Sequence, residues 1–199
     1  MGCPAAGGSG SDYAAQGAVA LQVRARRHLR RRDRPGGRGQ VPRILNFERG
    51  TTMEPQIPLI STWTKGPLGI AHLPRLWLKL RLTAKGRLAD GYRSGEGGFD
   101  GHVLTHLGLG LDSVRSFIES QPSYVEFEAW VRQNATPESL TQEAIDRVNE
   151  QMLTFEKSGE NRANQLEFVG LPVDDTVWLG ADLNNLDDWQ AFHLMLLDQ

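Results

Sequence analysis

An acidic residue and two histidines stand close together in the stretch GGFDGHVLTHLG, residues 97–108. His102 and His106 are four positions apart, so on a helix their rings project from one side and could share a metal ion. Two histidines supply only half of a zinc site, and HVLTH lacks the glutamate that acts as base in the H-E-x-x-H motif. We therefore expect no metal here: one ring should hydrogen-bond a loop carbonyl, and the other should face water.

Asp100 allows two interpretations. A carboxylate behind a glycine-rich loop could orient a histidine as a general base. An aspartate at the start of a helix also serves as an N-cap, which contributes about 1 kcal/mol by satisfying backbone amides. We favour the cap.

His72 and Arg75 flank a Leu-Pro pair at the start of a predicted helix. They could present two cationic groups to an anionic ligand, aided by the helix dipole. Such an arginine more often pairs with an acidic side chain on a neighbouring helix, and Asp187 and Asp188 are available partners. Arg75 is thus the candidate for ligand binding, and His72 joins Asp100, His102 and His106 as a candidate for catalysis.

The elements that would position these residues are helical. Leu73, Leu76, Trp77 and Leu80 recur with the spacing of one helix face, and Gly86 suits a left-handed stop. Residues 86–98 contain five glycines and read as a loop. Residues 99–107 can then form a helix of two turns.

The rest of the chain continues this pattern. Asp112 is predicted to cap the next helix, and SYVE at 123–126 is a capping box. Residues 136–138 (TPE) should open the longest helix, which Gly159 ends; the last segment should form a short helix, a turn and a final helix from about Leu186. Alternating strand patterns are nearly absent, so we predict an all-α fold, a compact bundle of short helices with a Gly-rich loop.

Charge divides the chain of 199 residues at about position 52. Residues 1–52 hold ten Arg, no Lys and three acidic residues, whereas residues 53–199 hold 12 basic and 21 acidic residues. The arginine- and glycine-rich part is predicted to be a disordered tail. It could be a nucleic-acid-binding arm or a transit peptide, but we favour translation assigned from too early a start, with Met53 opening a helical domain of unknown function. The acidic domain is an unfavourable nucleic-acid surface.

Cys3 is the only cysteine, so no internal disulfide is possible. No apolar run approaches the roughly 18–20 residues of a membrane span. We expect a cytoplasmic protein with no membrane association and no cofactor.

Several short stretches resemble one known family. They are Ile70–Arg75, Gly98–Asp100, Glu126–Trp130, Val177–Leu179 and Leu186–Trp189. The chain from about residue 61 to 193 resembles an uncharacterised bacterial family known as domain of unknown function 5069. The resemblance implies a small, mostly helical protein and brings no activity or catalytic residue with it.

Three functions remain open. The leading hypothesis is a module that binds a small molecule or a protein partner and is not catalytic, because no complete catalytic constellation is present. The second is a small, metal-assisted hydrolase-like enzyme built on Asp100, His102, His106 and His72. The third is nucleic-acid contact through the basic tail.

Overall fold

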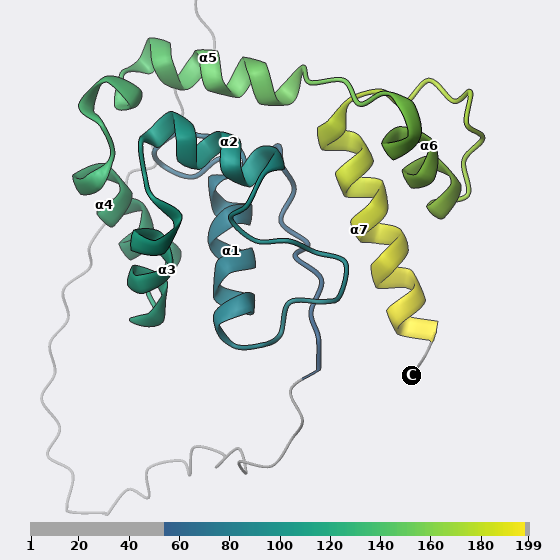
Figure 1. Ribbon diagram of the computed structural model, residues 1–199, viewed down its shortest axis with the longest axis horizontal. Coiled ribbons are helices and arrows are strands. Elements are labelled where there is room, and N and C mark those ends of the chain that lie inside the picture. Colours follow the sequence, from purple (N-terminus) through teal and green to yellow (C-terminus); the bar gives the residue numbers. More distant parts are fainter. Residues whose placement is uncertain (1–53, 198–199) are drawn as a thin grey trace, which may run out of the picture. The chain divides into compact units, whose positions relative to one another are not determined.

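The computed structural model describes residues 54–197 (Figure 1). The predicted tail lies outside these residues, and the start of the domain at residue 53 stays a prediction. Residues 54–197 contain no β-strand, only isolated bridges, which confirms the all-α prediction. The helices are α1 (Leu73–Ala84), α2 (Gly98–Leu107), α3 (Leu111–Glu119), α4 (Tyr124–Asn134), the 3₁₀ helix η1 (Pro137–Leu140), α5 (Gln142–Leu153), α6 (Gly159–Phe168) and α7 (Gly180–Leu197).

Helix α1 is central to the core and packs against α2, α3 and α4. Its leucines at 73, 76 and 80 are buried, as the spacing predicts. Pro74 occupies the first turn, where its missing N–H removes no helical hydrogen bond, and Gly86 follows the helix with φ of +60°. Buried side chains from α2 to α5 complete the core, among them Val103, Leu107, Val114, Ile118, Phe127, Val131, Ile145 and Val148.

The capping box before α4 is confirmed. Ser123 accepts a hydrogen bond from the backbone N–H of Glu126, and the Glu126 carboxylate accepts one from the Ser123 N–H. The predicted cap of α3 is wrong, because α3 begins one residue before Asp112 and its N-cap is Gly110. Asp112 therefore lies in the first turn, where its charge still favours the helix dipole.

The prediction of one long helix from residue 136 to Gly159 is wrong. Pro137 begins only the short helix η1, after which Thr141 returns to an extended conformation. The Thr141 hydroxyl accepts from the N–H of Ala144 at 3.3 Å and caps α5, which ends at Leu153. Gly159, with φ of +64°, opens α6 rather than closing α5.

The last helix is also longer than predicted. Helix α7 has 18 residues and runs through the Asn184-Asn185 pair without a turn. Figure 1 shows it as the yellow helix beside α6, and it packs against both α6 and α5. Asp187 and Asp188 consequently lie inside α7 and not in its first turn, which frees them for contacts with other elements.

Candidate functional site

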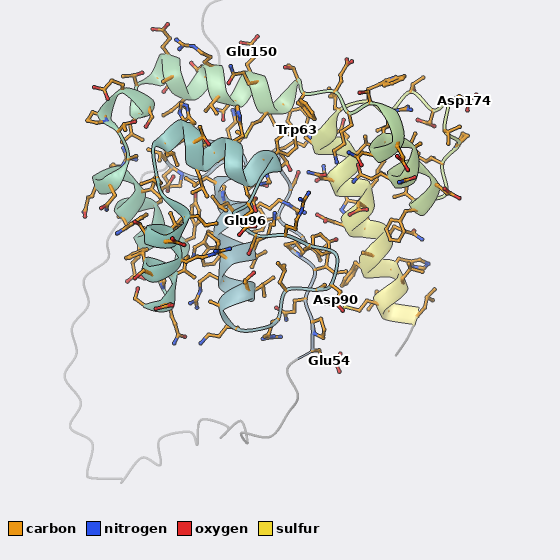
Figure 2. All side chains as sticks on the ribbon, in the orientation of Figure 1. Glu54, Trp63, Asp90, Glu96, Glu150 and Asp174 are labelled. Atoms are coloured by element: carbon orange, nitrogen blue, oxygen red, sulfur yellow. The ribbon has the colours of Figure 1, made fainter. Side chains whose placement is uncertain are left out.

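A cleft of about 940 Å³ opens on the surface formed by residues 54–197. Its walls come from α1, the Gly-rich loop, α2, the end of α5, α6 and α7; Glu96 marks the loop in Figure 2. Four predicted site residues line this cleft, namely His72, Arg75, Asp100 and His102. Its volume lies within the range of small-molecule sites.

Arg75 and Asp188 form a buried ion pair between α1 and α7. Nη1 of Arg75 lies 2.5 Å from Oδ2 of Asp188, and Nη2 lies 2.9 Å from Oδ1. Arg75 also donates to the carbonyls of Pro58 and Ile60, and the Tyr92 hydroxyl donates to Asp188 at 3.0 Å. Of the two partners that the sequence offers, the structure selects Asp188, and both terminal nitrogens of the guanidinium donate to protein groups.

His72, Asp100 and Lys79 form a second buried network. Nε2 of His72 lies 2.7 Å from Oδ1 of Asp100, and Nζ of Lys79 donates to Oδ2 at 2.6 Å. The backbone N–H of Gly95 donates to the same Oδ2 at 2.7 Å, which ties the Gly-rich loop to α2. Asp100 is therefore not an N-cap: Gly97 precedes α2 and no side chain caps it. The carboxylate points to a histidine and a lysine of α1 instead of to the first amides of its own helix.

The backbone of His72 is unusual. It adopts a left-handed conformation with φ of 67°, which is uncommon for a residue other than glycine. His72 lies directly before α1 and is buried, with 2% of its surface exposed. Its imidazole packs edge-on against the ring of Phe99, with the ring centroids 5.6 Å apart. Backbone strain of this kind is found at functional sites when surrounding contacts hold it in place.

The hydrogen bonds of His72 indicate which tautomer is present. Burial lowers the pKa of His72 below 6.5, although Asp100 opposes this effect, so the ring is neutral at pH 7. An ionised carboxylate only accepts, so the proton is on Nε2, and Nδ1 accepts from the Thr62 hydroxyl at 3.2 Å. Both ring nitrogens are engaged.

Asp100 is held in its ionised form. Burial alone would raise its pKa, but the hydrogen bonds from His72 and Lys79, together with the positive charge of Lys79, outweigh it and lower the pKa to about 2. Burial lowers the pKa of Lys79, and Asp100 partly reverses this. The network is thus a fixed array of charges in the cleft wall.

The side chains of His102 and His106 do not share a site. His102 is exposed at the cleft, whereas Nε2 of His106 lies 3.0 Å from the carbonyl oxygen of Ser139, away from the cleft. This agrees with the expectation of one ring on a loop carbonyl and one toward water. Within residues 54–197, no three His, Cys, Asp or Glu side chains come together as a metal site would require.

The cleft also contains residues that the sequence analysis missed. Lys79 follows His72 and Arg75 at positions i+7 and i+4, so helical spacing could have placed it on the same face of the helix. Lys157 and Asp187 also line the cleft, together with amide side chains of α6 and α7. No local pattern links them to α1, because only the packing of α6 and α7 brings them to the cleft.

Comparison with known families gives one match. Residues 67–187 match the model of a family described as Domain of unknown function (DUF5069). The chain belongs to this family. The DUF5069 region contains His72, Arg75, Lys79 and Asp100, and it ends one residue before Asp188. The comparison with curated proteins found no match.

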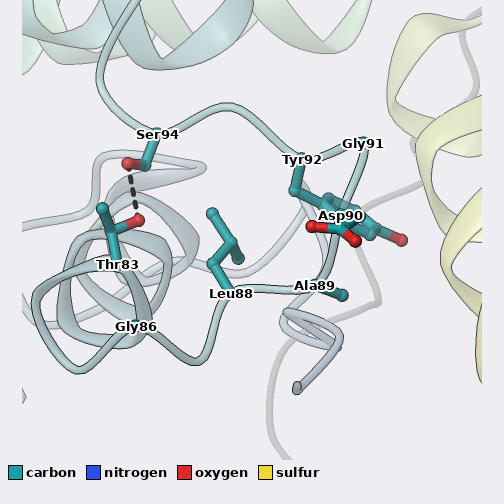
Figure 3. Close-up of a pocket in the computed structure, with 8 residues that line it drawn as sticks. All are labelled: Thr83, Gly86, Leu88, Ala89, Asp90, Gly91, Tyr92 and Ser94. Atoms are coloured by element: carbon teal, nitrogen blue, oxygen red, sulfur yellow. Dashed lines mark hydrogen bonds between the residues drawn. The ribbon is translucent and has the colours of Figure 1, made fainter.

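A second, smaller cavity lies at the other end of the Gly-rich loop of this DUF5069 protein. It has a volume of about 360 Å³ and is lined by Thr83, Gly86, Leu88–Tyr92 and Ser94, as Figure 3 shows. Asp90 is its only carboxylate, and the Tyr92 hydroxyl is already bonded to Asp188. It offers few groups for recognition, so the larger cleft is the stronger candidate.

No helix within residues 54–197 combines the length and the apolar character that crossing a bilayer would require.

Proposed function

We propose that this DUF5069 domain is a binding module that takes a small molecule into the cleft between α1, α2, α6 and α7. The observation that carries the proposal is the pair of buried ionic networks in the cleft wall, Arg75–Asp188 and His72–Asp100–Lys79. Buried ion pairs contribute little net stability compared with well-packed apolar residues. Charged groups that are fixed beside a cleft of ligand size are typical of binding sites.

The rigidity of the cleft wall supports binding. Arg75 joins three segments of the chain, namely residues 58–60, α1 and α7, and Asp100 joins α1, the Gly-rich loop and α2. A wall that is ordered before the ligand arrives lowers the entropic cost of binding. The cleft is also lined by Phe99 and Phe155, whose ring centroids lie 5.9 Å apart in an edge-on contact and which offer apolar surface.

The alternative is a small enzyme that uses Asp100, His102, His106 and His72. The meeting of His72 with Asp100 favours it, but both nitrogens of His72 already have partners, and Asp100 accepts from three donors. A general base needs a free nitrogen or oxygen within hydrogen-bond reach of its substrate. Among those candidate residues that line the cleft within residues 54–197, only His102 has a ring nitrogen without a hydrogen-bond partner, so binding has the stronger support.

The third alternative, nucleic-acid contact through the basic tail, falls on residues outside those described. For the domain itself, the excess of acidic over basic residues in 53–199 is unfavourable to phosphate binding.

We assign the protein to the cytoplasm as part of the same proposal, because a single cysteine requires no oxidising compartment.

The proposal is tested by thermal-shift screening of the full chain against amino acids, nucleotides, sugar phosphates and carboxylic acids. A ligand of the folded state raises Tm. Two variants locate the site: Asn164→Trp places a bulky ring in the cleft, whereas Glu167→Trp is exposed on the same helix outside it. We expect a compound that stabilises the wild type and Glu167→Trp but not Asn164→Trp. Finding no stabilising compound, or one that stabilises all three proteins equally, would contradict the proposal.

A further inference from the structure

Lys157 places a half-buried ammonium group in the cleft without a carboxylate partner. Its Nζ donates to Oε1 of Gln165 at 2.6 Å and to Oδ1 of Asn184 at 2.9 Å, and it forms no ion pair within residues 54–197. An ammonium has three N–H donors, so one remains for a ligand.

The two amides beside Lys157 are oriented by it. Because an ammonium only donates, the oxygens of Gln165 and Asn184 face Lys157, and their NH₂ groups are left as donors. Neither NH₂ group finds an acceptor in the described part of the chain, and both residues line the cleft. The lysine and the two amides thus form a donor-rich subsite suited to a small anionic group such as a carboxylate.

Asp187 supplies the opposite charge close by. It lies three residues after Asn184, so both occupy one face of α7, and it also lines the cleft. It accepts no hydrogen bond from a side chain and forms no ion pair within residues 54–197. Burial, followed by the neighbouring charge of Asp188, raises the pKa of Asp187, and Lys157 lowers it. Its carboxylate is therefore an acceptor that lacks a donor.

Lys157 and Asp187 are close enough to influence each other but do not pair. Burial lowers the pKa of Lys157, and the charge of Asp187 opposes this effect. Each group has thus lost part of its hydration without gaining a counter-ion, which is unfavourable. A ligand that brings one charge of each sign would compensate both groups at once.

The other charged side chains of the cleft also favour a ligand with one charge of each sign. Four basic and four acidic side chains line it, so it attracts neither anions nor cations as a class. Lys79 is already paired with Asp100, and Glu96 with Arg115. Arg93 and Glu156 are exposed at the rim. The groups left inside the cleft for a ligand are one cation and one carboxylate.

We propose, building on the binding function above, that the ligand is an α-amino-acid-like zwitterion with an apolar side chain. Lys157 and the NH₂ groups of Gln165 and Asn184 hold its carboxylate, and Asp187 holds its ammonium. The apolar side chain lies on the rings of Phe99 and Phe155. No bond is made or broken in this step.

Calorimetric titration of the full chain with three related compounds tests this assignment. L-Phenylalanine carries both charges, phenylpropanoate lacks the ammonium, and phenethylamine lacks the carboxylate. We expect L-phenylalanine to bind at least about tenfold more tightly than either singly charged compound, the effect of one lost ion pair. Equal affinity for either analogue, or no binding of L-phenylalanine, would overturn the assignment.

Single variants separate the two subsites. Lys157→Met should weaken L-phenylalanine and phenylpropanoate by about tenfold and leave phenethylamine unchanged. Asp187→Asn should weaken L-phenylalanine and phenethylamine and leave phenylpropanoate unchanged. Asp174→Asn, which removes the same charge at the exposed position marked in Figure 2, is the control and should change none of them. The same loss of affinity for all three compounds in either cleft variant would contradict the subsites. If a variant fails to fold, the affinities of the wild type for the three compounds decide the question.

The zwitterion assignment and the binding function fail in different ways. If L-phenylalanine does not bind but another compound stabilises the wild type and not Asn164→Trp, the assignment is wrong and the binding function holds. If no compound of the wider screen binds in the cleft, both are wrong.

Discussion

Arg75 and Asp188 are 113 positions apart in the sequence and meet in a two-point ion pair, with N–O distances of 2.5 and 2.9 Å. Their side chains are 5% and 3% exposed. Because Arg75 belongs to α1 and Asp188 to α7, the pair links these two helices. Asp187, which lines the cleft, is the residue directly before Asp188 in α7.

Removing one partner of this pair should strongly destabilise the domain. In Asp188→Ala the buried guanidinium loses its counter-ion, and we expect the free energy of unfolding to fall by about 3–5 kcal/mol. Urea denaturation followed by circular dichroism measures the loss. The exposed pair of Arg147 and Glu143 is the control, and Glu143→Ala should change the stability by less than about 0.5 kcal/mol.

The double variant Arg75→Met with Asp188→Leu should recover most of that loss, because apolar residues can replace a buried ion pair at little cost. A stability of Asp188→Ala within about 1 kcal/mol of the wild type would contradict the structural role of the pair.

The folded domain should lose stability as the pH falls from 7 to about 5. Burial lowers the pKa of His72 below 6.5, so under about pH 6.5 the unfolded chain takes up a proton that the folded chain does not. The pKa of His106 is also lowered by burial and acts in the same direction. Asp100 stabilises the fold above its ordinary pKa of 3.8, because its pKa in the folded chain is lowered to about 2, and this stabilisation is lost only as the pH falls below about 3.8.

The variant His72→Asn isolates the contribution of His72 to this loss of stability at low pH, since asparagine tolerates the left-handed backbone. We expect this variant to be less stable at pH 7 but to show a shallower fall between pH 7 and 5 in urea titrations at stepped pH. Parallel curves for the variant and the wild type would show that His72 is not buried in its neutral form.

Two glycines of the Gly-rich loop should respond differently to alanine. Gly91 and Gly95 have similar φ values, +86° and +83°, but a Cβ at Gly91 would meet nothing within 4 Å, whereas one at Gly95 would collide with Leu111. Gly91→Ala should cost about 1 kcal/mol from backbone strain alone. Gly95→Ala should cost more, because it also displaces the N–H that binds Asp100. Equal losses in thermal denaturation would contradict the packing of this loop.

The capping box should contribute measurably to α4. Ser123→Ala removes the hydroxyl that accepts from Glu126 and should lower the free energy of unfolding by about 1 kcal/mol. Ser116→Ala, an exposed serine inside α3, is the matched control and should have little effect. A loss no larger than that of the control would show that the cap is not stabilising in solution.

Much of the fold could be predicted because its signals are local. The spacing of the α1 leucines, the glycine after α1 and the capping box at Ser123 depend only on residues within a few positions of one another. The Asn184-Asn185 pair misled the prediction, because packing of α7 against α5 and α6 outweighs the weak helix propensity of asparagine. Pro137 misled it as well, because the helix that it begins ends at Leu140 and Thr141 caps a new one.

Only part of the site could be predicted, because only some of its residues are marked by local signals. His72, Arg75 and Asp100 stood out by type and position, and the ion pair of Arg75 was among the expected outcomes. The orientation of Asp100 toward α1, and the arrival of Lys157 and Asp187 at the same cleft, depend on contacts between distant segments. Such contacts leave no periodic trace in the sequence.

The most direct test of the central claim, that this cleft binds a small molecule, is amide chemical-shift mapping of the ¹⁵N-labelled full chain. L-Phenylalanine and each compound that raises Tm would be titrated in turn. We predict that the perturbed amides cluster around the cleft, at Gly97, Phe99, Ser158 and Asn184. Perturbations confined to the surface of α3 and α4, or none at saturating ligand, would contradict it.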